Sequence, residues 1–489
     1  MKSYLYKYFK YILLAVIVFV PLFGDLDTLP IRIWDEARLG VNAFEMTQNG
    51  NLIVTHFEGE PDMWSVKPPL MIWAQALCMK LFGVNELAVR LPAAMAALVT
   101  CLVLLIFGLR YLKDYWFGFI AVTVLITSYG YIDLHGARNG DYDVPLAMFT
   151  TLSGLLFFAY CETKKRLHLY LFFLFVILGV LTKGIAGLLF IPAISIYALI
   201  QKEIIPLLRN KHFYFGLLSF VFIVIGYYLL RDASNPGFLD TVQKNELGGR
   251  YLKVIENHER SFWWYFNSFL QPRFAAWYLL VPCGVVVGWF SKEAKIKKLT
   301  IYLTLLVLTF FIVISSAKTK VRWYDIPMYP FLSILVAIFL HYIYKLLNSG
   351  AWFKQTLRIN IVPFLFLFLV LITPYRKIIN HTNDPQEQKW RKDFYDIGYY
   401  LKDALNGKHQ LNGQFLLYQG YYAHNLFYLN ALNNQGTQIS FKDWRNLQPG
   451  DIVIVPQQRL KNYVVEHYLF DIVKEEGSVF TYQIKEVIE

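Results

Sequence analysis

Two adjacent carboxylates and a later lysine could carry acid-base and phosphate chemistry near the start of the chain. Asp35 and Glu36 stand together, and Lys67 is followed by two prolines that fix the backbone and end any helix there. A carboxylate can take the proton from an attacking hydroxyl, whereas a cation can stabilise a departing phosphate. These residue types predict a reactive site within residues 25–86.

The composition indicates a membrane protein. The chain has 489 residues, of which 56% are hydrophobic, 18% aromatic and only 17% charged, and its mean hydropathy is +0.38. Water-soluble domains average about 25% charged residues. A net charge of +12 could suit nucleic acid, but the lysines and arginines fall in short clusters between apolar runs. We therefore expect a polytopic α-helical membrane protein with no nucleic-acid partner.

About eleven apolar segments approach the roughly 20 residues that a helix needs to cross a bilayer. Lysines precede the first segment and no small-residue cleavage site follows it, so we expect an uncleaved span whose amino terminus lies inside. The segments are 11–23, 87–109, 115–131, 144–160, 167–181, 185–200, 213–230, 274–290, 299–315, 326–344 and 359–373.

Basic residues then set the orientation, because cytoplasmic loops are enriched in lysine and arginine. With the amino terminus inside, every predicted inner loop is basic, and the loop at 291–298 alone holds four lysines. We therefore expect a multi-pass protein of the bacterial inner membrane whose reactive site faces the periplasm. The predicted outer stretches are 25–86, 132–143, 182–184, 231–273, 317–325 and everything after residue 374.

The composition becomes polar from about residue 375. Strand-like runs at 414–418, 451–455 and 479–484 are separated by Asn, Gly and Pro, which are typical of turns. The sequence therefore predicts a transmembrane domain at 1–374, whose first outer loop is the catalytic one, followed by a small extracytoplasmic α/β domain at 375–489.

Acids and bases gathered at one membrane face suit a reaction on a lipid-linked, phosphate-bearing substrate. If a sugar leaves a lipid phosphodiester, the charge on the phosphate grows from one toward two, so nearby cations bind the transition state more tightly than the ground state. We expect Asp35 to deprotonate or orient the acceptor hydroxyl, with Glu36 and Asp143 assisting, and direct displacement predicts inversion at the sugar carbon. The predicted phosphate-binding residues are Lys67, Arg138, Lys183, Lys318, Lys320 and Arg322, and the weaker site candidates are Arg90, His258 and Tyr324.

Six blocks of the chain resemble the membrane glycosyltransferases that include aminoarabinose lipid A transferase and the protein O-mannosyltransferases. The resemblance implies a C-type glycosyltransferase (GT-C) fold, a polyprenyl-phosphate sugar donor and a catalytic acidic residue in the first outer loop, which here is Asp35. The blocks occur in family order: Trp-Asp-Glu-Ala-Arg at 34–38, Lys-Pro-Pro-Leu at 67–70, the run at 81–92, residues 137–152, Leu-Thr-Lys-Gly at 181–184 and residues 316–330.

One position departs from that family. In the aminoarabinose transferases a glutamate associated with a metal precedes the lysine of the Lys-Pro-Pro motif, and here this residue is Val66. His258 and the aromatic run after it resemble the family's histidine block. Without the carboxylate we do not expect the same metal site, and a divalent cation elsewhere stays an open question.

Several candidates have structural alternatives. Asp35 could cap a helix, and Lys67 could extend to the lipid headgroups. Arg90 could pair with Glu86 one helical turn away. An ion pair among the charged residues of 138–143 is the interpretation that we prefer for Asp141.

A transporter of lipid-linked sugars is the alternative function. It would place ionisable groups deep within the spans and show two related halves with broken helices. The candidate charges gather in outer loops instead, and no internal repeat is visible. We therefore expect a glycosyltransferase with a polyprenyl-phosphate sugar as donor and a glycolipid, protein or glycan as acceptor, present as a monomer among membrane lipids.

Overall fold

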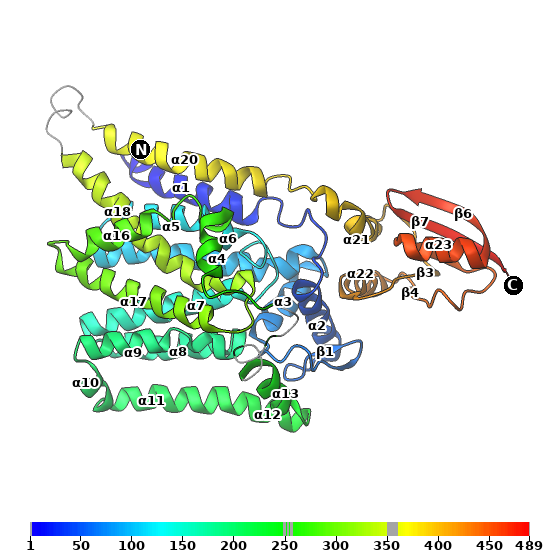
Figure 1. Cartoon of the computed structure of the whole chain (residues 1–489), viewed down its shortest axis with the longest axis horizontal. Coiled ribbons are helices and arrows are strands. Elements are labelled where there is room, and N and C mark those ends of the chain that lie inside the picture. Colours follow the sequence, from blue (N-terminus) through cyan, green and yellow to red (C-terminus); the bar gives the residue numbers. More distant parts are fainter. Residues whose placement is uncertain (1, 248–250, 252–253, 255–257, 350–359, 489) are drawn as a thin grey trace.

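The computed structural model describes residues 2–247, 251, 254, 258–349 and 360–488. The described chain forms a bundle of helices, and a small domain with a five-stranded sheet lies at one end of this bundle (Figure 1). Helix α2 (Asp35–Asn49), which carries the two adjacent carboxylates, lies at that same end (Figure 1).

Apolar helices occupy the predicted segments. Seven helical stretches among the described residues are long and apolar enough to cross a membrane. The helices at the other segments are shorter, and the predicted start of the last segment at 359 lies outside the described residues, so the count of about eleven spans stays a prediction. The bundle helices are α1 (Lys2–Phe23), α4 (Glu86–Phe107), α5 (Tyr115–Ile126), α7 (Asp143–Thr163), α8 (Arg166–Lys183), α9 (Ile191–Ile200), α11 (Lys211–Phe220), α12 (Gly226–Ser234), α16 (Leu280–Trp289), α17 (Ala294–Ser316), α18 (Tyr329–Ser349) and α20 (Val362–Thr382).

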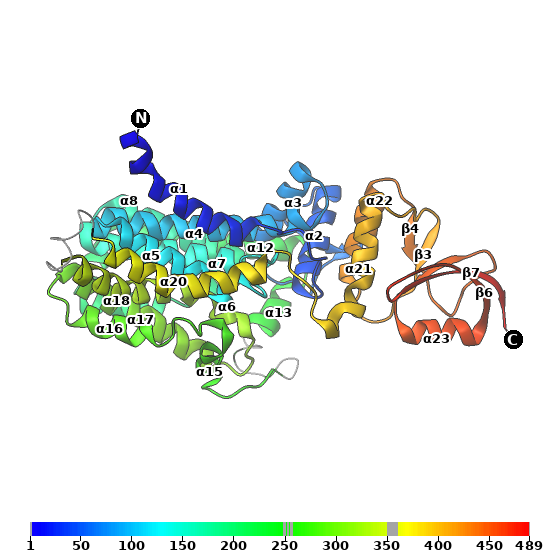
Figure 2. The ribbon, with the colours of Figure 1, turned by 90° about the horizontal axis from the view of Figure 1, so that it is seen from above.

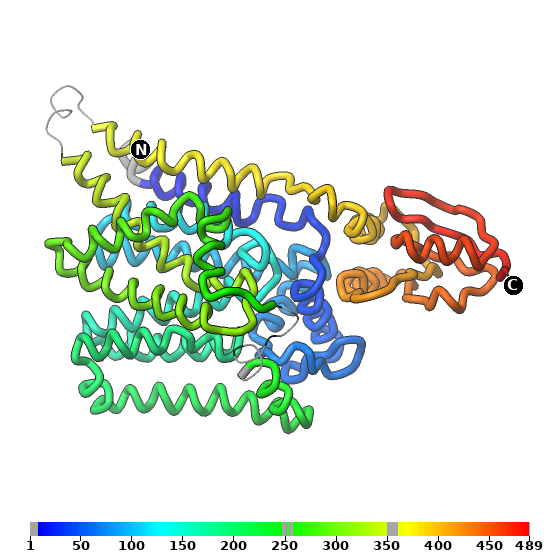
Figure 3. The backbone as a smooth tube through the Cα atoms, in the orientation of Figure 1, coloured from blue at the N-terminus to red at the C-terminus, as the bar shows by residue number. Residues whose placement is uncertain are grey.

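The bundle has an inner helix and outer helices that need lipid around them. In the candidate span Arg322–Ser349, 83% of the most apolar stretch is buried inside the protein. In Lys211–Ser234, 17% of that stretch is buried. An apolar helix with so little protein cover must face hydrocarbon. The first and last bundle helices, α1 and α20, run side by side along one edge (Figure 3). The fold is therefore that of a multi-pass membrane protein.

Short helices connect or extend the long ones. Such short helices often occur where the chain changes direction, and η2 connects α8 to α9 in this way. These elements are η1 (Gly108–Leu112), α6 (Tyr129–Ile132), η2 (Gly184–Leu188), α10 (Ile204–Leu208), η3 (Val221–Ile225), α13 (Phe238–Val242), η4 (Gln243–Leu247), α15 (Trp264–Ser268), η5 (Phe269–Arg273) and η6 (Arg322–Met328).

The first outer loop is a folded unit. α2 begins with two carboxylates, which suit the positive end of a helix dipole, and ends at Gly50 in the left-handed region (φ 67°). An ion pair closes the loop, since Arg38 donates two hydrogen bonds to Asp62 at 2.9 and 2.7 Å. The other elements of the loop are β1 (His56–Phe57), β2 (Glu60–Pro61) and α3 (Leu70–Phe82).

The Asp62 carboxylate should make the stability of this loop depend on pH. Burial alone would raise the pKa of Asp62, but the hydrogen bonds and charge of Arg38 outweigh burial and hold this pKa below its ordinary value. Its stabilising contribution is therefore present above the unfolded pKa of about 3.9 and is lost as the pH falls through the folded-state pKa. The thermal stabilities of wild type and Asp62→Asn should differ most near neutral pH and converge below about pH 4. A difference that is constant across this range would contradict the assignment.

The carboxyl-terminal domain is a small α/β unit. Its sheet has the order β4-β3-β5-β7-β6, with β3 parallel to β4 and β5 and with β7 antiparallel to β5 and β6. The three predicted strands correspond to β3, β5 and β7, and β4 and β6 were not predicted. The elements are η7 (Lys389–Arg391), α21 (Lys392–Leu405), β3 (Gln414–Leu416), α22 (Ala423–Asn434), β4 (Ile439–Phe441), β5 (Ile452–Val455), α23 (Gln458–His467), β6 (Tyr468–Glu476) and β7 (Val479–Val487).

This domain shares a hydrophobic core with the first outer loop. Helices α21 and α22 stand between the bundle and the sheet (Figure 2), and one buried cluster joins Leu39 and Val41 of α2 to Leu401 of α21 and Phe427 of α22. The predicted boundary after residue 374 falls inside α20, which continues to Thr382. The sheet domain is thus fastened to the loop that carries Asp35.

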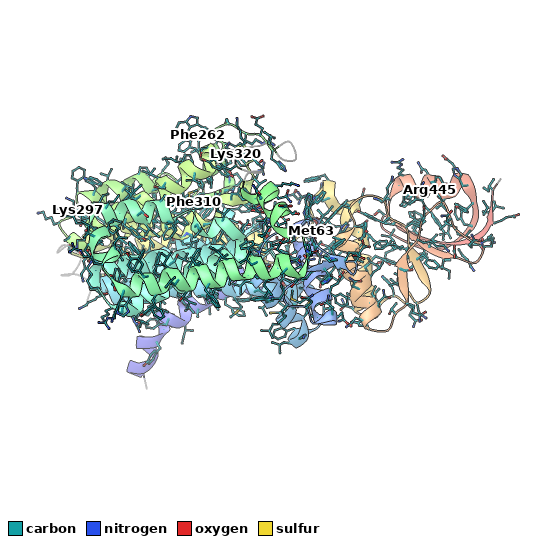
Figure 4. All side chains as sticks on the ribbon, turned by 90° about the horizontal axis from the view of Figure 1, so that it is seen from below. Met63, Phe262, Lys297, Phe310, Lys320 and Arg445 are labelled. Carbon is teal, nitrogen blue, oxygen red and sulfur yellow. The ribbon has the colours of Figure 1, made fainter. Side chains whose placement is uncertain are left out.

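Labelled side chains mark the two ends of the bundle. Lys297, which a predicted inner loop contributes to α17, lies at the end away from the sheet domain (Figure 4). Met63 of the first outer loop lies at the opposite end, and Arg445 lies in the sheet domain beyond it (Figure 4). The basic inner loop and the first outer loop are therefore at opposite ends of the bundle.

Candidate functional site

Asp35 opens α2, and its carboxylate is accessible. The side chain is 43% exposed, and its Oδ2 lies 3.9 Å from Nδ1 of His135. Trp34, just before it, has a backbone φ of 73°, a region that residues other than glycine rarely adopt. Backbone strain of this kind persists where the surrounding structure over-determines it, which is common beside functional sites.

His135 connects Asp35 to a second carboxylate. Its Nδ1 is hydrogen-bonded to Asp141, and its ring stacks on Trp323 with the centroids 3.5 Å apart. Burial alone would lower the pKa of His135, but the charge and hydrogen bond of Asp141, together with the charges of Asp35 and Asp143, raise this pKa above its ordinary value. The imidazole therefore lies between two carboxylates.

Asp143 begins α7 and pairs with the lysine that ends α8. Lys183 Nζ lies 2.5 Å from Asp143 Oδ1 and 5.1 Å from the ring centroid of Tyr324. The other oxygen, Oδ2 of Asp143, is buried and accepts no hydrogen bond from the described residues. A buried carboxylate oxygen without a donor is costly, which suggests that a ligand group completes this site.

A cavity of about 130 Å³ opens beside this pair. Its polar lining consists of two lysines, two carboxylates, two tyrosines and a threonine: Lys67, Lys183, Asp143, Glu246, Tyr251, Tyr324 and Thr319. Its apolar wall lies inside the bundle, where Figure 4 shows Phe310. An anionic headgroup with a hydrocarbon chain would match both parts. The apolar residues are Leu146, Ile185, Ala186, Leu189, Phe310, Val313, Ile314, Ala317 and Pro327.

Lys67 reaches the cavity from the first outer loop. Its Nζ is 5.2 Å from the ring centroid of Tyr142 and 3.9 Å from a carboxylate oxygen of Glu246. The Tyr142 hydroxyl in turn lies 3.1 Å from Oγ of Ser65. Since Asp141 and Asp143 flank Tyr142, one short segment connects the accessible Asp35 cluster to the cavity.

Glu36 was predicted to assist catalysis, but its carboxylate is fully used in holding the fold. It is buried, and its two oxygens accept hydrogen bonds from Arg90 at 2.9 and 3.1 Å and from the backbone of Arg32 and Gly140 at 2.7 and 2.9 Å. Burial alone would raise the pKa of Glu36, but the charge and hydrogen bonds of Arg90, together with the backbone hydrogen bonds from Gly140 and Arg32, hold this pKa below its ordinary value. This geometry assigns Glu36 a structural role.

Arg90 does not make its main pair with Glu86, as the sequence suggested. Besides Glu36, its guanidinium donates to the carbonyls of Leu26, Leu29 and Pro30 at 2.7 to 2.9 Å. Arg90 therefore binds the loop before Asp35, and this role leaves its guanidinium unavailable to a substrate.

Arg138 is likewise occupied by the backbone. It donates to the carbonyls of Pro21, Asp25 and Thr382, which joins the ends of α1 and α20. It pairs with neither Asp141 nor Asp143, so the predicted ion pair among these three residues is wrong. Asp141 pairs with His135 instead, and Asp143 pairs with Lys183. The phosphate-binding role predicted for Arg138 is not supported by this arrangement.

The three cations after α17, which are Lys318, Lys320 and Arg322, lie in different surroundings. Lys320 donates to the carbonyls of Arg260 and Ala317 on a segment that stands off the bundle beside Phe262 (Figure 4). His258 accepts from the Lys320 backbone through its carbonyl, and neither residue lines the cavity. Lys318 and Arg322 are exposed. Of the predicted phosphate-binding set, Lys67 and Lys183 are the ones that line the cavity.

The residues present do not fit the metal site of the aminoarabinose transferases. Val66 is buried against Phe238 and Val242 and offers no ligand atom. A different set of donors, on Asp35, His135 and Asp141, lies within 4.8 Å of one another and could hold a divalent cation. A metal there would replace the hydrogen bond between His135 and Asp141.

Several residues of the site were not predicted from the sequence. His135 carries no motif of its own, whereas Trp323 and Tyr142 lie in the blocks at 316–330 and 137–152 but were not chosen as site residues. The available signal was their place in outer stretches: His135 lies in the same predicted stretch as Arg138 and Asp143. A histidine and a tyrosine among candidate acids in one short outer stretch deserve testing as site residues.

The sequence is similar to those of several known proteins. Residues 66–228 match the family model described as dolichyl-phosphate-mannose-protein mannosyltransferase. An uncharacterised protein of Aquifex aeolicus is 27% identical over 74% of this chain and 68% of its own length. An undecaprenyl phosphate-alpha-4-amino-4-deoxy-L-arabinose arabinosyl transferase of Aeromonas hydrophila is 28% identical over 64% of this chain. That alignment spans 56% of the Aeromonas protein, little more than half its length.

The fold resembles solved structures over nearly the whole chain. ArnT from Cupriavidus metallidurans, bound to undecaprenyl phosphate, superposes with a TM-score of 0.71 at 15% identity, covering 97% of this chain and 98% of that one. The oligosaccharyltransferase AglB from Archaeoglobus fulgidus gives a TM-score of 0.50 at 10% identity, covering 87% and 64%. The chain therefore has the C-type membrane glycosyltransferase fold.

Within this class the sequence matches are more specific. The match to the family model includes the blocks at 67–70 and 181–184. The chain is thus similar in sequence to the aminoarabinose transferases and to the protein mannosyltransferases, and it shares the fold of a solved aminoarabinose transferase.

Proposed function

We propose that this protein transfers a sugar from a polyprenyl-phosphate donor to an acceptor hydroxyl at the outer face of the inner membrane. The observation that carries the proposal is the cavity with Lys67 and Lys183 at its polar end and apolar side chains along its wall. A lipid phosphate has the same two parts, a negative head and a hydrocarbon chain. Such a pocket inside a membrane bundle favours a lipid-linked donor over a soluble nucleotide sugar.

The chemistry follows from the position of the charges. The bond between the sugar carbon and the phosphate oxygen breaks, and its electron pair stays on the phosphate, which becomes a dianion. Lys67 and Lys183 stabilise this added charge. The acceptor oxygen forms the new bond to the sugar carbon, and its proton passes to the carboxylate of Asp35. Direct displacement of this kind inverts the configuration at the sugar carbon, through an oxocarbenium-like transition state.

His135 and Asp141 support the base. The imidazole of His135, whose Nδ1 lies 3.9 Å from Oδ2 of Asp35, orients the carboxylate of the proposed base. Asp141 in turn holds the imidazole in place through its hydrogen bond to Nδ1 of His135. Asp143 holds Lys183 at the cavity, so its role is to position a phosphate-binding cation rather than to act as a second base.

The first outer loop and the sheet domain are proposed to lie in the periplasm. The basic loop at 291–298 marks the opposite end of the bundle, and basic loops stay in the cytoplasm. The acceptor would then be a glycolipid, protein or glycan of the cell envelope. No feature of the described residues favours the transporter alternative, since the paired charges lie at helix ends and loops rather than at mid-span.

A reconstituted assay tests the proposal. Purified protein in liposomes should consume a radiolabelled polyprenyl-phosphate sugar and release polyprenyl phosphate together with glycosylated acceptor. Net movement of the donor between leaflets without product would identify a flippase instead. Extracts of the cell envelope can supply acceptors, and mass spectrometry of the product would identify both the sugar and the acceptor.

Removal of a cavity cation should weaken use of the donor. Lys67→Met is expected to lower kcat/KM for the donor about 100-fold, because one electrostatic contact to the phosphate is lost. Steady-state kinetics with varied donor measure this effect. Lys80→Met is the matched control, since Lys80 is an exposed lysine of the same outer loop, and it should change the rate by about two-fold or less. Equal effects of the two substitutions would contradict phosphate binding by Lys67.

A further inference from the structure

Residues 30–34, which lead into Asp35, are held by the carboxyl-terminal domain. The backbone N–H of Ile31 donates to the Tyr428 hydroxyl at 3.0 Å, and that of Ile33 donates to the Tyr395 hydroxyl at 3.4 Å. Both tyrosines belong to the helices α21 and α22. The orientation of the residue that follows, Trp34, is thus set from the sheet domain as well as from the bundle.

Trp34 presents a large aromatic ring beside the accessible carboxylate. Its side chain is 56% exposed although it precedes Asp35 directly. Tryptophan is usually well buried, because no other side chain has as much apolar surface to remove from water. An exposed tryptophan on a strained backbone (φ 73°) is stabilised for a purpose other than core packing.

A tyrosine of the other domain supports this ring from behind. The rings of Trp34 and Tyr421 stack with their centroids 4.4 Å apart and their planes 17° from parallel. Tyr421 follows Gly420, whose φ of 100° turns the chain toward α2, and its hydroxyl pairs with Arg38. Each ring of the stack is therefore held by its own surroundings. The first outer loop contributes Trp34, and the carboxyl-terminal domain contributes Tyr421.

The position of the stack separates it from the donor cavity. Helix α2 lies between α22 on one side and α7 on the other in both views (Figures 1 and 2). The cavity is formed on the side of α7, through Asp143 and Lys183, whereas Trp34 faces the domain that carries α22. Asp35 stands between the two, where a base for the acceptor must be.

We propose that Trp34 and Tyr421 form the acceptor platform, on which a sugar ring of the acceptor lies with its C–H face against the Trp34 indole. The inference rests on the glycosyl transfer proposed above and specifies its acceptor as a glycolipid or glycan. A sugar ring has an apolar face and a rim of hydroxyls, so stacking on the indole brings one hydroxyl to the neighbouring carboxylate. A serine or threonine side chain of a protein acceptor has no such face.

Kinetics with varied acceptor test the platform. Trp34→Ala is expected to raise KM for a glycolipid acceptor about 10- to 100-fold, the range found for stacking of a ring on an aromatic side chain. Trp34→Phe should restore most of this loss because it keeps an aromatic face. Trp390→Ala is the matched control, since Trp390 is a 73% exposed tryptophan of the carboxyl-terminal domain whose ring contacts the Arg391 guanidinium rather than another aromatic ring of the described residues.

Two further measurements distinguish binding from a structural role. The ratio of transfer to donor hydrolysis by water should fall in Trp34→Ala, because water needs no platform, and equilibrium binding of the donor should stay within about two-fold of wild type. Loss of transfer and hydrolysis to the same extent would show that Trp34 only positions Asp35 and would overturn the proposal. Transfer to a Ser/Thr-rich peptide that is insensitive to Trp34→Ala would also overturn it.

These experiments also distinguish an error in the proposed glycosyl transfer from an error in the proposed acceptor platform. If wild type neither hydrolyses the donor nor transfers its sugar to any acceptor, the proposed glycosyl transfer is wrong. If wild type transfers the sugar and Trp34→Ala leaves KM for the glycolipid unchanged, the transfer stands and the platform is wrong.

Discussion

Replacement of Asp35 by asparagine is expected to lower glycosyl transfer about 10²- to 10⁴-fold, the usual contribution of a general base. The amide keeps the size and hydrogen-bonding reach of the carboxylate but cannot accept the proton of the acceptor hydroxyl. The side chain is 43% exposed and lies 3.9 Å from His135, whose hydrogen bond goes to Asp141 instead, so the fold should survive the change. The measurement is the rate of product formation at saturating donor and acceptor, with protein folding checked by thermal unfolding in detergent.

Asp27→Asn is the control for this experiment. Asp27 is an exposed carboxylate of the same outer loop, eight residues before the proposed base. It should leave the rate within about two-fold of wild type. If Asp35→Asn folds and transfers sugar at the wild-type rate, Asp35 is not the base, and the mechanism proposed here must be abandoned.

The arrangement of the bundle could largely be predicted from the sequence. Apolar segments, basic inner loops and the polar change near residue 375 are each set by the cost of placing charges or unpaired backbone in lipid. That cost acts on local composition, so it is visible without knowledge of the fold. The exact number of spans was less accessible, because α5, α9 and α16 are apolar but short.

The division of roles between Asp35 and Glu36 could not be predicted. The two carboxylates are adjacent, but their side chains leave a helix in directions about 100° apart. Glu36 therefore meets Arg90 from a helix 54 residues later, whereas Asp35 points to accessible space near His135. The same long-range pairing explains why Arg138, predicted to bind phosphate, is used by backbone carbonyls instead.

The sheet domain is part of the site rather than a separate module. From composition alone it was expected as an outer domain of unassigned role. The packing of Phe427 on α2, the hydrogen bonds of Tyr428 and Tyr395 to the chain before Asp35, and the stack of Tyr421 on Trp34 join it to the base. These contacts bring together residues almost 400 positions apart, which local patterns cannot reveal.

Replacement of Glu36 by glutamine is expected to destabilise the protein by about 3 to 5 kcal/mol, the usual cost of leaving a buried charge without its partner. The Arg90 guanidinium would remain buried, and the ordered chain from Leu26 to Pro30 would lose its anchor at the base of the site. Thermal or denaturant unfolding in detergent measures the loss, and Asp35→Asn serves as the neighbouring control that should stay near wild type.

The double variant Glu36→Leu with Arg90→Met separates a structural pair from a catalytic carboxylate. Since both charges are removed together, its loss of stability should be smaller than the sum of the two single losses. If Glu36→Gln instead unfolds like wild type but transfers no sugar, Glu36 acts in the chemistry, and the structural role given to it by its four hydrogen bonds is wrong.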